Sequence, residues 1–214
     1  TTADGKECEG LEQGPFEPIA VIGLAAIMPD AENATQFWQN IIDAKVSIKQ
    51  IPEGRWPGPS NNFWRQGGPG AVEEGFTYSK IGALVDGYEF DWRRWRQPPG
   101  TLPQIDICQQ WAVAVSADAI EDAGFDGESK DIDRVRTGVV FANALGGENR
   151  NMSNIRVWSN HTKQLASQHG LPDSNMDSFI EDVVRGTPRI DEDTMPGELA
   201  NVVSGRVANL LDLQ

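Results

Sequence analysis

Two short runs of β-branched apolar residues constrain the fold of this chain more than any other feature. The first is residues 19–22, closed by Gly23, and the second lies within residues 136–143. Apolar side chains fill consecutive positions in both runs, which is typical of strands buried on both faces of a sheet. Segments with helical periodicity alternate with these runs. The alternation predicts an α/β fold built on a layered sheet.

Local capping signals predict where helices begin and end in the first half of the chain. Asn33 with Gln36, and Asp106 with Gln109, have the spacing of a capping box, so a helix is expected to follow each pair's first residue. Gly124 has the position that commonly ends a helix, which places the end of the second one.

The helical signals of the second half are weaker. Residues 149–185 are expected to be helical, with an interruption at Gly170 and Pro172. A last helix is expected to start near Pro196, since proline suits the first turn. Small residues predict that this helix is slim and passes through a crowded core: Ala200, Ser204, Gly205 and Ala208.

Residues 49–104 have a different character, with most of the tryptophans, many prolines and glycines, and little periodicity. They predict a long surface excursion held down by aromatic anchors, with a short hairpin near residues 82–90. A loop of this length inside a compact domain is usually functional. The expected anchors are four tryptophans: Trp56, Trp64, Trp92 and Trp95.

Charge and cysteine usage exclude several classes of protein. The net charge of −14 disfavours non-specific binding to nucleic acid and to an anionic membrane surface. The longest apolar run, residues 19–28, is too short to span a bilayer. The only cysteines, Cys8 and Cys108, do not make a disulfide framework, so a reducing cytoplasm is expected.

The chain is expected to divide into a short leader and one domain. Residues 1–16 are polar and rich in glycine, which predicts a flexible leader or linker, or a stretch added to the natural sequence. Residues 17–214 contain the patterned segments and are expected to form the domain.

Two motifs near helix starts have both a chemical and a structural interpretation. Gly23, Ala25 and Met28 have the spacing of a dinucleotide-binding turn, but Met28 is too large for its third position, which favours a simple turn at a strand end. Cys108 lies at a helix N-terminus, which can activate a thiol. No glycine-rich turn exposes it, so a small packed side chain is the favoured interpretation.

The histidines and one basic cluster complete the set of candidates. His161 and His169 have no partner cysteine or serine signature and are expected on the surface. The basic cluster is interleaved with tryptophans, and it either docks an acidic partner or a phosphate, or packs its stems on the aromatic faces. It consists of three arginines: Arg93, Arg94 and Arg96.

Four blocks, in order, resemble the ketosynthase family, the thiolase-fold condensing enzymes of polyketide and fatty-acid synthases. The tryptophan-rich excursion is most similar to large iterative synthases, such as those that make polyunsaturated fatty acids or enediyne-type polyketides. The blocks are residues 17–56, residues 82–99, residues 105–124 and residues 197–213.

The resemblance implies a thiolase-like layered α-β-α-β-α fold, of which this chain is the first half, in a homodimer. It also implies decarboxylative Claisen condensation between an acyl thioester and a malonyl unit, delivered on the phosphopantetheine of an acyl carrier protein, with no other cofactor bound. The family's nucleophilic cysteine would fall shortly after Gln214, and its two histidines later still, so no catalytic residue is assigned here. Met195 and Leu199 are expected to approach the acyl pocket.

These implications leave three hypotheses about the chain. It acts only with the remaining half of the ketosynthase domain, it is a non-catalytic scaffold that docks the carrier protein through the three arginines, or it is a nucleotide-binding α/β domain. Half of a layered fold leaves a sheet face uncovered. The isolated chain is therefore expected to oligomerise, to repack, or to need its complement.

Overall fold

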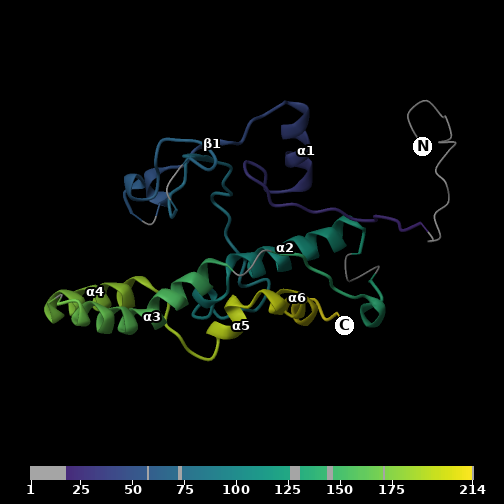
Figure 1. Cartoon of the computed structure of the whole chain (residues 1–214). Coiled ribbons are helices and arrows are strands. Elements are labelled where there is room, and N and C mark those ends of the chain that lie inside the picture. Colours follow the sequence, from purple (N-terminus) through teal and green to yellow (C-terminus); the bar gives the residue numbers. More distant parts are fainter. Residues whose placement is uncertain are drawn as a thin grey trace.

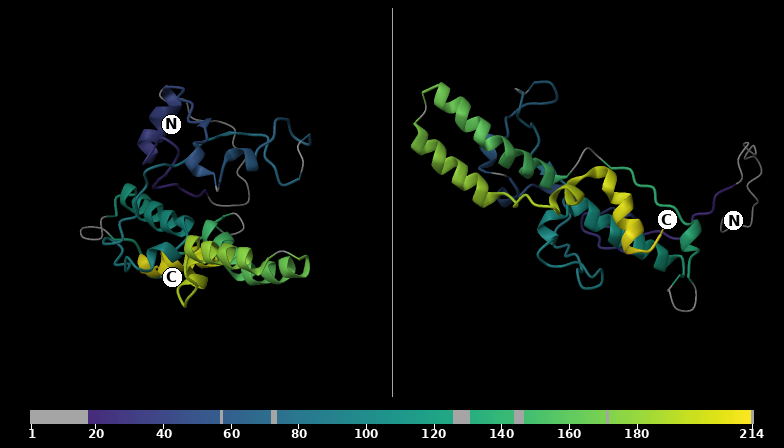
Figure 2. Two further views of the ribbon diagram at one scale, coloured as in Figure 1. Left: turned by 90° about the vertical axis from the view of Figure 1, so that its left-hand side faces the viewer. Right: turned by 90° about the horizontal axis from the view of Figure 1, so that it is seen from below.

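The computed structural model describes residues 18–56, 58–71, 74–125, 131–143, 147–170 and 172–213. The predicted leader, residues 1–16, and Cys8 lie outside the described residues. Figures 1 and 2 show a smaller N-terminal part, with helix α1 and strand β1, lying over a larger helical body. No helix of the described residues is both long and apolar enough to cross a membrane.

The N-terminal part begins with a helix whose cap was predicted correctly. The Asn33 side chain accepts a hydrogen bond from the Gln36 amide at 2.9 Å, and the Gln36 side chain accepts one from the Glu32 amide at 2.9 Å. The reciprocal bond therefore reaches one residue further back than in a standard capping box. The elements of this part are α1 (Ala34–Ile42), β1 (Lys49–Gln50), the 3-10 turns η1 (Glu53–Arg55) and η2 (Ser60–Asn62), and β2 (Ile81–Gly82).

Strands β1 and β2 pair antiparallel, with Lys49 opposite Gly82, and close a loop over residues 51–80, the first part of the tryptophan-rich segment. The predicted hairpin at residues 82–90 is therefore wrong, because β2 finds its partner earlier in the chain. Aromatic anchoring is visible inside the segment. The Trp64 indole donates to the Tyr78 carbonyl at 3.1 Å, and the Lys80 ammonium lies 4.3 Å from the Trp64 ring centroid.

The helical body is organised around α2 (Ile107–Asp122), which crosses its middle in Figure 1. α2 packs against α6 (Val203–Leu210), and their buried contact residues form the core cluster. Gly124 ends α2 in the left-handed conformation, with φ of +80°, as predicted. The core cluster consists of four residues: Ala112, Val113, Val203 and Val207.

Two helices form a hairpin that projects from the body (Figures 1 and 2). They are α3 (Glu148–Gln168) and α4 (Asp173–Gly186), separated at the predicted interruption. Lys163 of α3 forms an ion pair with Asp177 of α4. The Arg156 guanidinium donates to the carbonyls of Val184 and Thr187 at 2.9 and 3.0 Å, which satisfies acceptors at the end of α4.

The two runs predicted as buried strands are extended but unpaired in the described part of the chain. Ile19 is 94% exposed and Val140 is 96% exposed. A strand exists only through backbone hydrogen bonds to a neighbouring strand, and these two runs have no strand partner among the described residues. Both runs nevertheless lie beside the body: a Cβ on Gly23 would stand 2.1 Å from the Ala119 carbonyl oxygen, and Val139 packs on the core cluster.

The predicted single last helix is broken into three pieces. Leu199 interrupts it with an extended backbone, φ −79° and ψ 124°. The Pro196 prediction is correct for the first turn only. The pieces are α5 (Thr194–Glu198), η5 (Ala200–Val202) and α6. The remaining 3-10 turns are η3 (Leu102–Gln104), before α2, and η4 (Arg134–Arg136), before the second extended run.

Candidate functional site

The start of α2, α5 and the start of α3 meet at a set of residues that we call the α5 junction, all of them buried except the half-buried Gln104: Gln104, Asp106, Gln109, Thr194 and Gly197. The Asp106 amide donates to the Gly197 carbonyl at 2.9 Å. A Cβ on Gly197 would stand 1.9 Å from the Gln104 carbonyl oxygen, so only glycine allows this approach. The Gln104 amide group also donates to the Asp191 carboxylate at 2.7 Å.

Asp106 links two helices of the junction through one carboxylate. Its oxygens accept from the Cys108 amide of α2 at 3.0 Å and from the Asn149 amide of α3 at 3.1 Å. The residue is only 2% exposed, so these bonds are shielded from water. Gly147 leaves room for the carboxylate, because a Cβ there would lie 1.8 Å from it. The predicted cap of α2 is thus confirmed, whereas no sequence pattern indicated the second role of Asp106 at α3.

Gln109 does not complete the predicted capping box with Asp106. Its side chain turns away from the cap and donates to the carbonyls of Pro196 and Leu199, at 3.0 and 3.2 Å. The Arg206 Nε of α6 donates to the Gln109 side-chain oxygen. Burial lowers the pKa of Arg206 below its usual range, and the nearby Asp193 charge acts in the opposite direction.

Cys108 is half-buried and packs on the core cluster, as the favoured interpretation predicted. Burial raises the pKa of its thiol to about 12, and the neighbouring Asp106 carboxylate contributes in the same direction. These effects outweigh the activation that a helix N-terminus can give. The thiol is therefore protonated at neutral pH, which is unsuited to a nucleophile.

Alkylation of Cys108 should accordingly be slow. In a Cys8→Ser variant at pH 8, we expect iodoacetamide to react with Cys108 on the order of a hundredfold more slowly than with an unperturbed thiol, because the small thiolate fraction outweighs its higher nucleophilicity. The same variant unfolded in urea is the reference. Equal rates in the folded and the unfolded protein would contradict the burial of this thiol.

The histidines lie away from this chemistry. His161 is exposed on α3, where its ring lies edge-on to Trp158 at a centroid distance of 5.4 Å. His169 is exposed at the end of the same helix. The surface placement predicted for both is confirmed. In the part of the chain that the structure describes, no group of three or more histidine, cysteine, aspartate or glutamate side chains is arranged to hold a metal ion.

The three predicted docking arginines have different environments. The Arg93 guanidinium lies 4.3 Å from the centroid of Trp92, and that of Arg94 lies 4.7 Å from the centroid of Trp95. Arg94 also forms ion pairs with two α2 acids, Asp118 at 3.6 Å and Glu121. All three arginines, including Arg96, are exposed. Packing on tryptophan is thus observed for Arg93 and Arg94, and docking by the cluster stays a prediction.

Gly23 is needed for packing against α2. Its closeness to the Ala119 carbonyl leaves no space for a side chain, and the next amide, of Leu24, donates to the Asp122 carboxylate at 2.8 Å. The Leu24 amide is therefore already bonded to a carboxylate of the protein. In a dinucleotide site, an amide at this position would donate to a phosphate of the ligand. The geometry favours the structural interpretation of the Gly23 motif.

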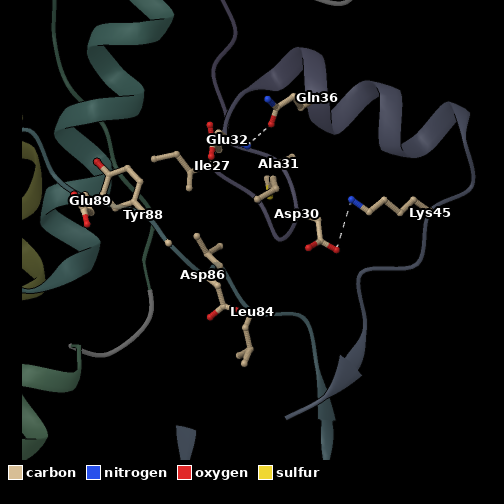
Figure 3. Close-up of a pocket in the computed structure, with 13 residues that line it drawn as sticks. Ile27, Asp30, Ala31, Glu32, Gln36, Lys45, Leu84, Asp86, Tyr88 and Glu89 are labelled. Atoms are coloured by element: carbon tan, nitrogen blue, oxygen red, sulfur yellow. Dashed lines mark hydrogen bonds and ion pairs between the residues drawn. The ribbon is translucent and has the colours of Figure 1, made fainter. Parts of the chain in front are cut away.

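A hollow of about 600 Å³ lies between residues 84–89 and a second wall formed by residues around Asp30, the start of α1 and Lys45 (Figure 3). No sequence pattern predicted it. Asp30 on its wall pairs with Lys49 at 2.8 Å and with Lys45 at 3.8 Å, and mainly the Lys49 hydrogen bond lowers the pKa of Asp30. Figure 3 shows Tyr88 and Glu89 on the side of the hollow nearer α2. Its two walls are distant in sequence, so no local pattern indicated it.

Comparison with known proteins identifies the family. Residues 16–214 match the family described as Beta-ketoacyl synthase, N-terminal domain. The chain belongs to the beta-ketoacyl synthase family. Among curated proteins, this chain is 35% identical over 133 residues to polyketide synthase ThaG of Burkholderia thailandensis, covering 62% of this chain and 2% of that protein. It is 25% identical over 197 residues to a polyunsaturated fatty acid synthase of Thraustochytrium sp., covering 91% of this chain and 7% of that protein.

Solved structures show the same fold. The oxazolomycin ketosynthase domain OzmH KS7 of Streptomyces albus superposes with a TM-score of 0.60 at 21% identity, over 91% of this chain and 27% of that one. A beta-ketoacyl synthase of Burkholderia phymatum gives a TM-score of 0.52 at 14% identity, over 90% and 36%. The predicted thiolase-like α/β fold is therefore correct, and this chain corresponds to a part of each of these longer chains.

The residues predicted to approach the acyl pocket of the ketosynthase lie at the α5 junction. Met195 is 55% exposed on α5, and Leu199 is half-buried at the break that follows. The Leu199 amide donates to the Met195 carbonyl at 3.2 Å, so the two positions are joined by one backbone turn. Their contact with an acyl chain stays a prediction.

Proposed function

We propose that this chain forms the N-terminal part of a ketosynthase domain that extends carrier-bound acyl chains in polyketide or fatty-acid synthesis. The observation that supports this most is the family match, which runs from residue 16 to residue 214. The polyketide and polyunsaturated fatty acid synthases among its relatives support the same substrate class.

The proposed reaction is a decarboxylative Claisen condensation. A cysteine thiolate holds the growing chain as a thioester, and a malonyl unit on the phosphopantetheine of an acyl carrier protein loses carbon dioxide. The resulting enolate carbon attacks the thioester carbonyl, so a carbon–carbon bond forms while the carbon–sulfur bond breaks and the thiolate is released. An activated thiolate and stabilisation of the enolate charge are the chemical requirements.

In this proposal the chain supplies structure and the complementary polypeptide supplies the reacting groups. Cys108 is unsuited to be the nucleophile because its thiol is protonated at neutral pH. The exposed histidines lie on α3 and at its end, and neither cysteine is near them in the sequence. The chain would contribute α2, the α5 junction and two extended runs that can join a larger sheet, with Met195 and Leu199 beside the acyl pocket.

Complementation tests the proposed function. We expect the 214-residue chain alone to form no condensation product from an acyl thioester and malonyl carrier protein. Mixing it with the separately expressed remainder of the domain should restore product formation, measured by mass spectrometry of the carrier-bound β-ketoacyl group. The remainder alone and the uncut domain are the controls. An inactive mixture beside an active uncut domain would refute the assembly, and an inactive uncut domain would refute the function.

A further inference from the structure

Gln109 is among the most buried polar side chains of the described residues, with 1% of its surface exposed, and no catalytic role requires it. It stands on the first turn of α2, yet all of its side-chain partners belong to α6 or to the segment around the α5 break. A buried amide engaged in this way is costly to leave unsatisfied. Its environment therefore indicates a specific positioning task.

The orientation of the Gln109 amide is fixed by Arg206. A guanidinium has only donors, so the Gln109 oxygen must face the Arg206 Nε. The Gln109 nitrogen is then directed to the opposite side, where it donates to the carbonyls of Pro196 and Leu199. Arg206 also donates directly to the Pro196 carbonyl at 3.3 Å, which holds the same set of contacts from the other end.

The two carbonyls that Gln109 bridges lie on opposite sides of the helix break. Pro196 is inside α5, and Leu199 is the extended residue between α5 and η5. One amide group thus satisfies acceptors that a continuous helix would have satisfied internally. It joins the α5 end to the start of η5 and fixes the bend between them, which includes Met195 on one side and Leu199 at its apex.

We infer that Gln109 is the residue that positions the α5–η5 bend and thereby sets which acyl-chain lengths the ketosynthase accepts. This inference rests on the proposed function, in which Met195 and Leu199 border the acyl pocket. A change at Gln109 moves the wall of that pocket, and selection by an apolar pocket depends on the fit of individual methylene groups. Gln109 acts through these residues and does not itself touch the acyl chain.

The decisive variant is Gln109→Glu in the complete natural ketosynthase domain. A carboxylate keeps the shape and still accepts from Arg206, but it cannot donate to the carbonyls of Pro196 and Leu199. We expect the ratio of kcat/KM for short and long acyl thioesters to change by about tenfold or more, and amide hydrogen exchange at residues 199–203 to accelerate by about tenfold. The affinity for the carrier protein should stay unchanged.

Gln110→Glu is the matched control, since Gln110 is the next residue of α2 and its amide donates to the Ile105 carbonyl at 2.8 Å and not to the carbonyls of Pro196 and Leu199. It should leave the chain-length ratio as in the wild type. Unchanged exchange at residues 199–203 in Gln109→Glu overturns the positioning role. Faster exchange with an unchanged ratio overturns the selectivity role. If Gln109→Glu does not fold, Arg206→Gln is the second variant, because it removes the guanidinium that fixes the orientation of the Gln109 amide. This variant must change the chain-length ratio in a folded domain, and an unchanged ratio overturns the inference. A wild-type domain without condensation activity would instead refute the proposed function.

Discussion

Asp106→Ala should lower the free energy of unfolding by about 2–4 kcal/mol, since it removes the shared cap of two helices. The half-buried Cys108 and Asn149 donate their amides to the buried Asp106 carboxylate, and the substitution removes this acceptor from both. Urea unfolding of the 214-residue chain, followed by tryptophan fluorescence, measures the change. The wild type and the variant must be compared at equal protein concentration, because association changes apparent stability.

Asp133→Ala is the control for this prediction. Asp133 also caps a helical turn, η4, where its carboxylate accepts from the Arg136 amide at 3.2 Å, but it is exposed to water. Water can replace the lost acceptor, so we expect a loss below about 1 kcal/mol. If both variants lose the same amount, the burial and the second helix at Asp106 contribute nothing, and the importance of the α5 junction is disproved.

Val140→Asp should have little effect on the stability of the isolated chain but should strongly impair the complete domain. Val140 is 96% exposed in the chain, so there the substitution should change stability by less than about 0.5 kcal/mol. In the complete domain we expect this run to be a sheet strand, where burying an unpaired carboxylate costs roughly several kcal/mol. Condensation should then fall by about a hundredfold or more, measured with the acyl and malonyl carrier substrates described above.

Val135→Asp separates burial in the sheet from a general effect of added charge. Val135 is also exposed, at 69%, but it lies in the 3-10 turn η4 that precedes the extended run. It should retain wild-type stability and condensation in both the chain and the domain. A Val140→Asp domain with full activity would show that this run is not buried in the assembled enzyme.

Features that depend on neighbouring residues were predictable from the sequence. The caps at Asn33 and Asp106 and the helix end at Gly124 follow from the hydrogen-bonding and backbone preferences of those residues. The two apolar runs predicted as buried strands are instead unpaired in the described residues, because the hydrogen bonds of a strand depend on the segment that lies beside it. Local patterns alone predicted only an α/β class, and the family resemblance added the specific thiolase-like layered fold.

The contacts of the candidate site depend on residues far apart in the chain. Gln109 is 87 residues from Pro196 and 97 from Arg206, so its spacing from Asp106 suggested a local cap that the structure does not form. No pattern in the sequence indicated that Arg94 forms ion pairs with Asp118 and Glu121 of α2, which lie 24 and 27 residues away. No periodicity or spacing encodes such pairs. They arise only when the helices have packed.

The pairing of β1 with β2 closes a loop over residues 51–80, the first part of the tryptophan-rich segment, with Gln50 opposite Ile81. Because its two ends are paired, the length of this loop has little effect on the positions of the residues outside it. The entropic cost of closing a loop also grows only slowly with its length. This loop is in that sense structurally independent of the helical body. A change in the length of residues 51–80 is therefore expected to leave the two ends of the loop and the helices beneath it in place.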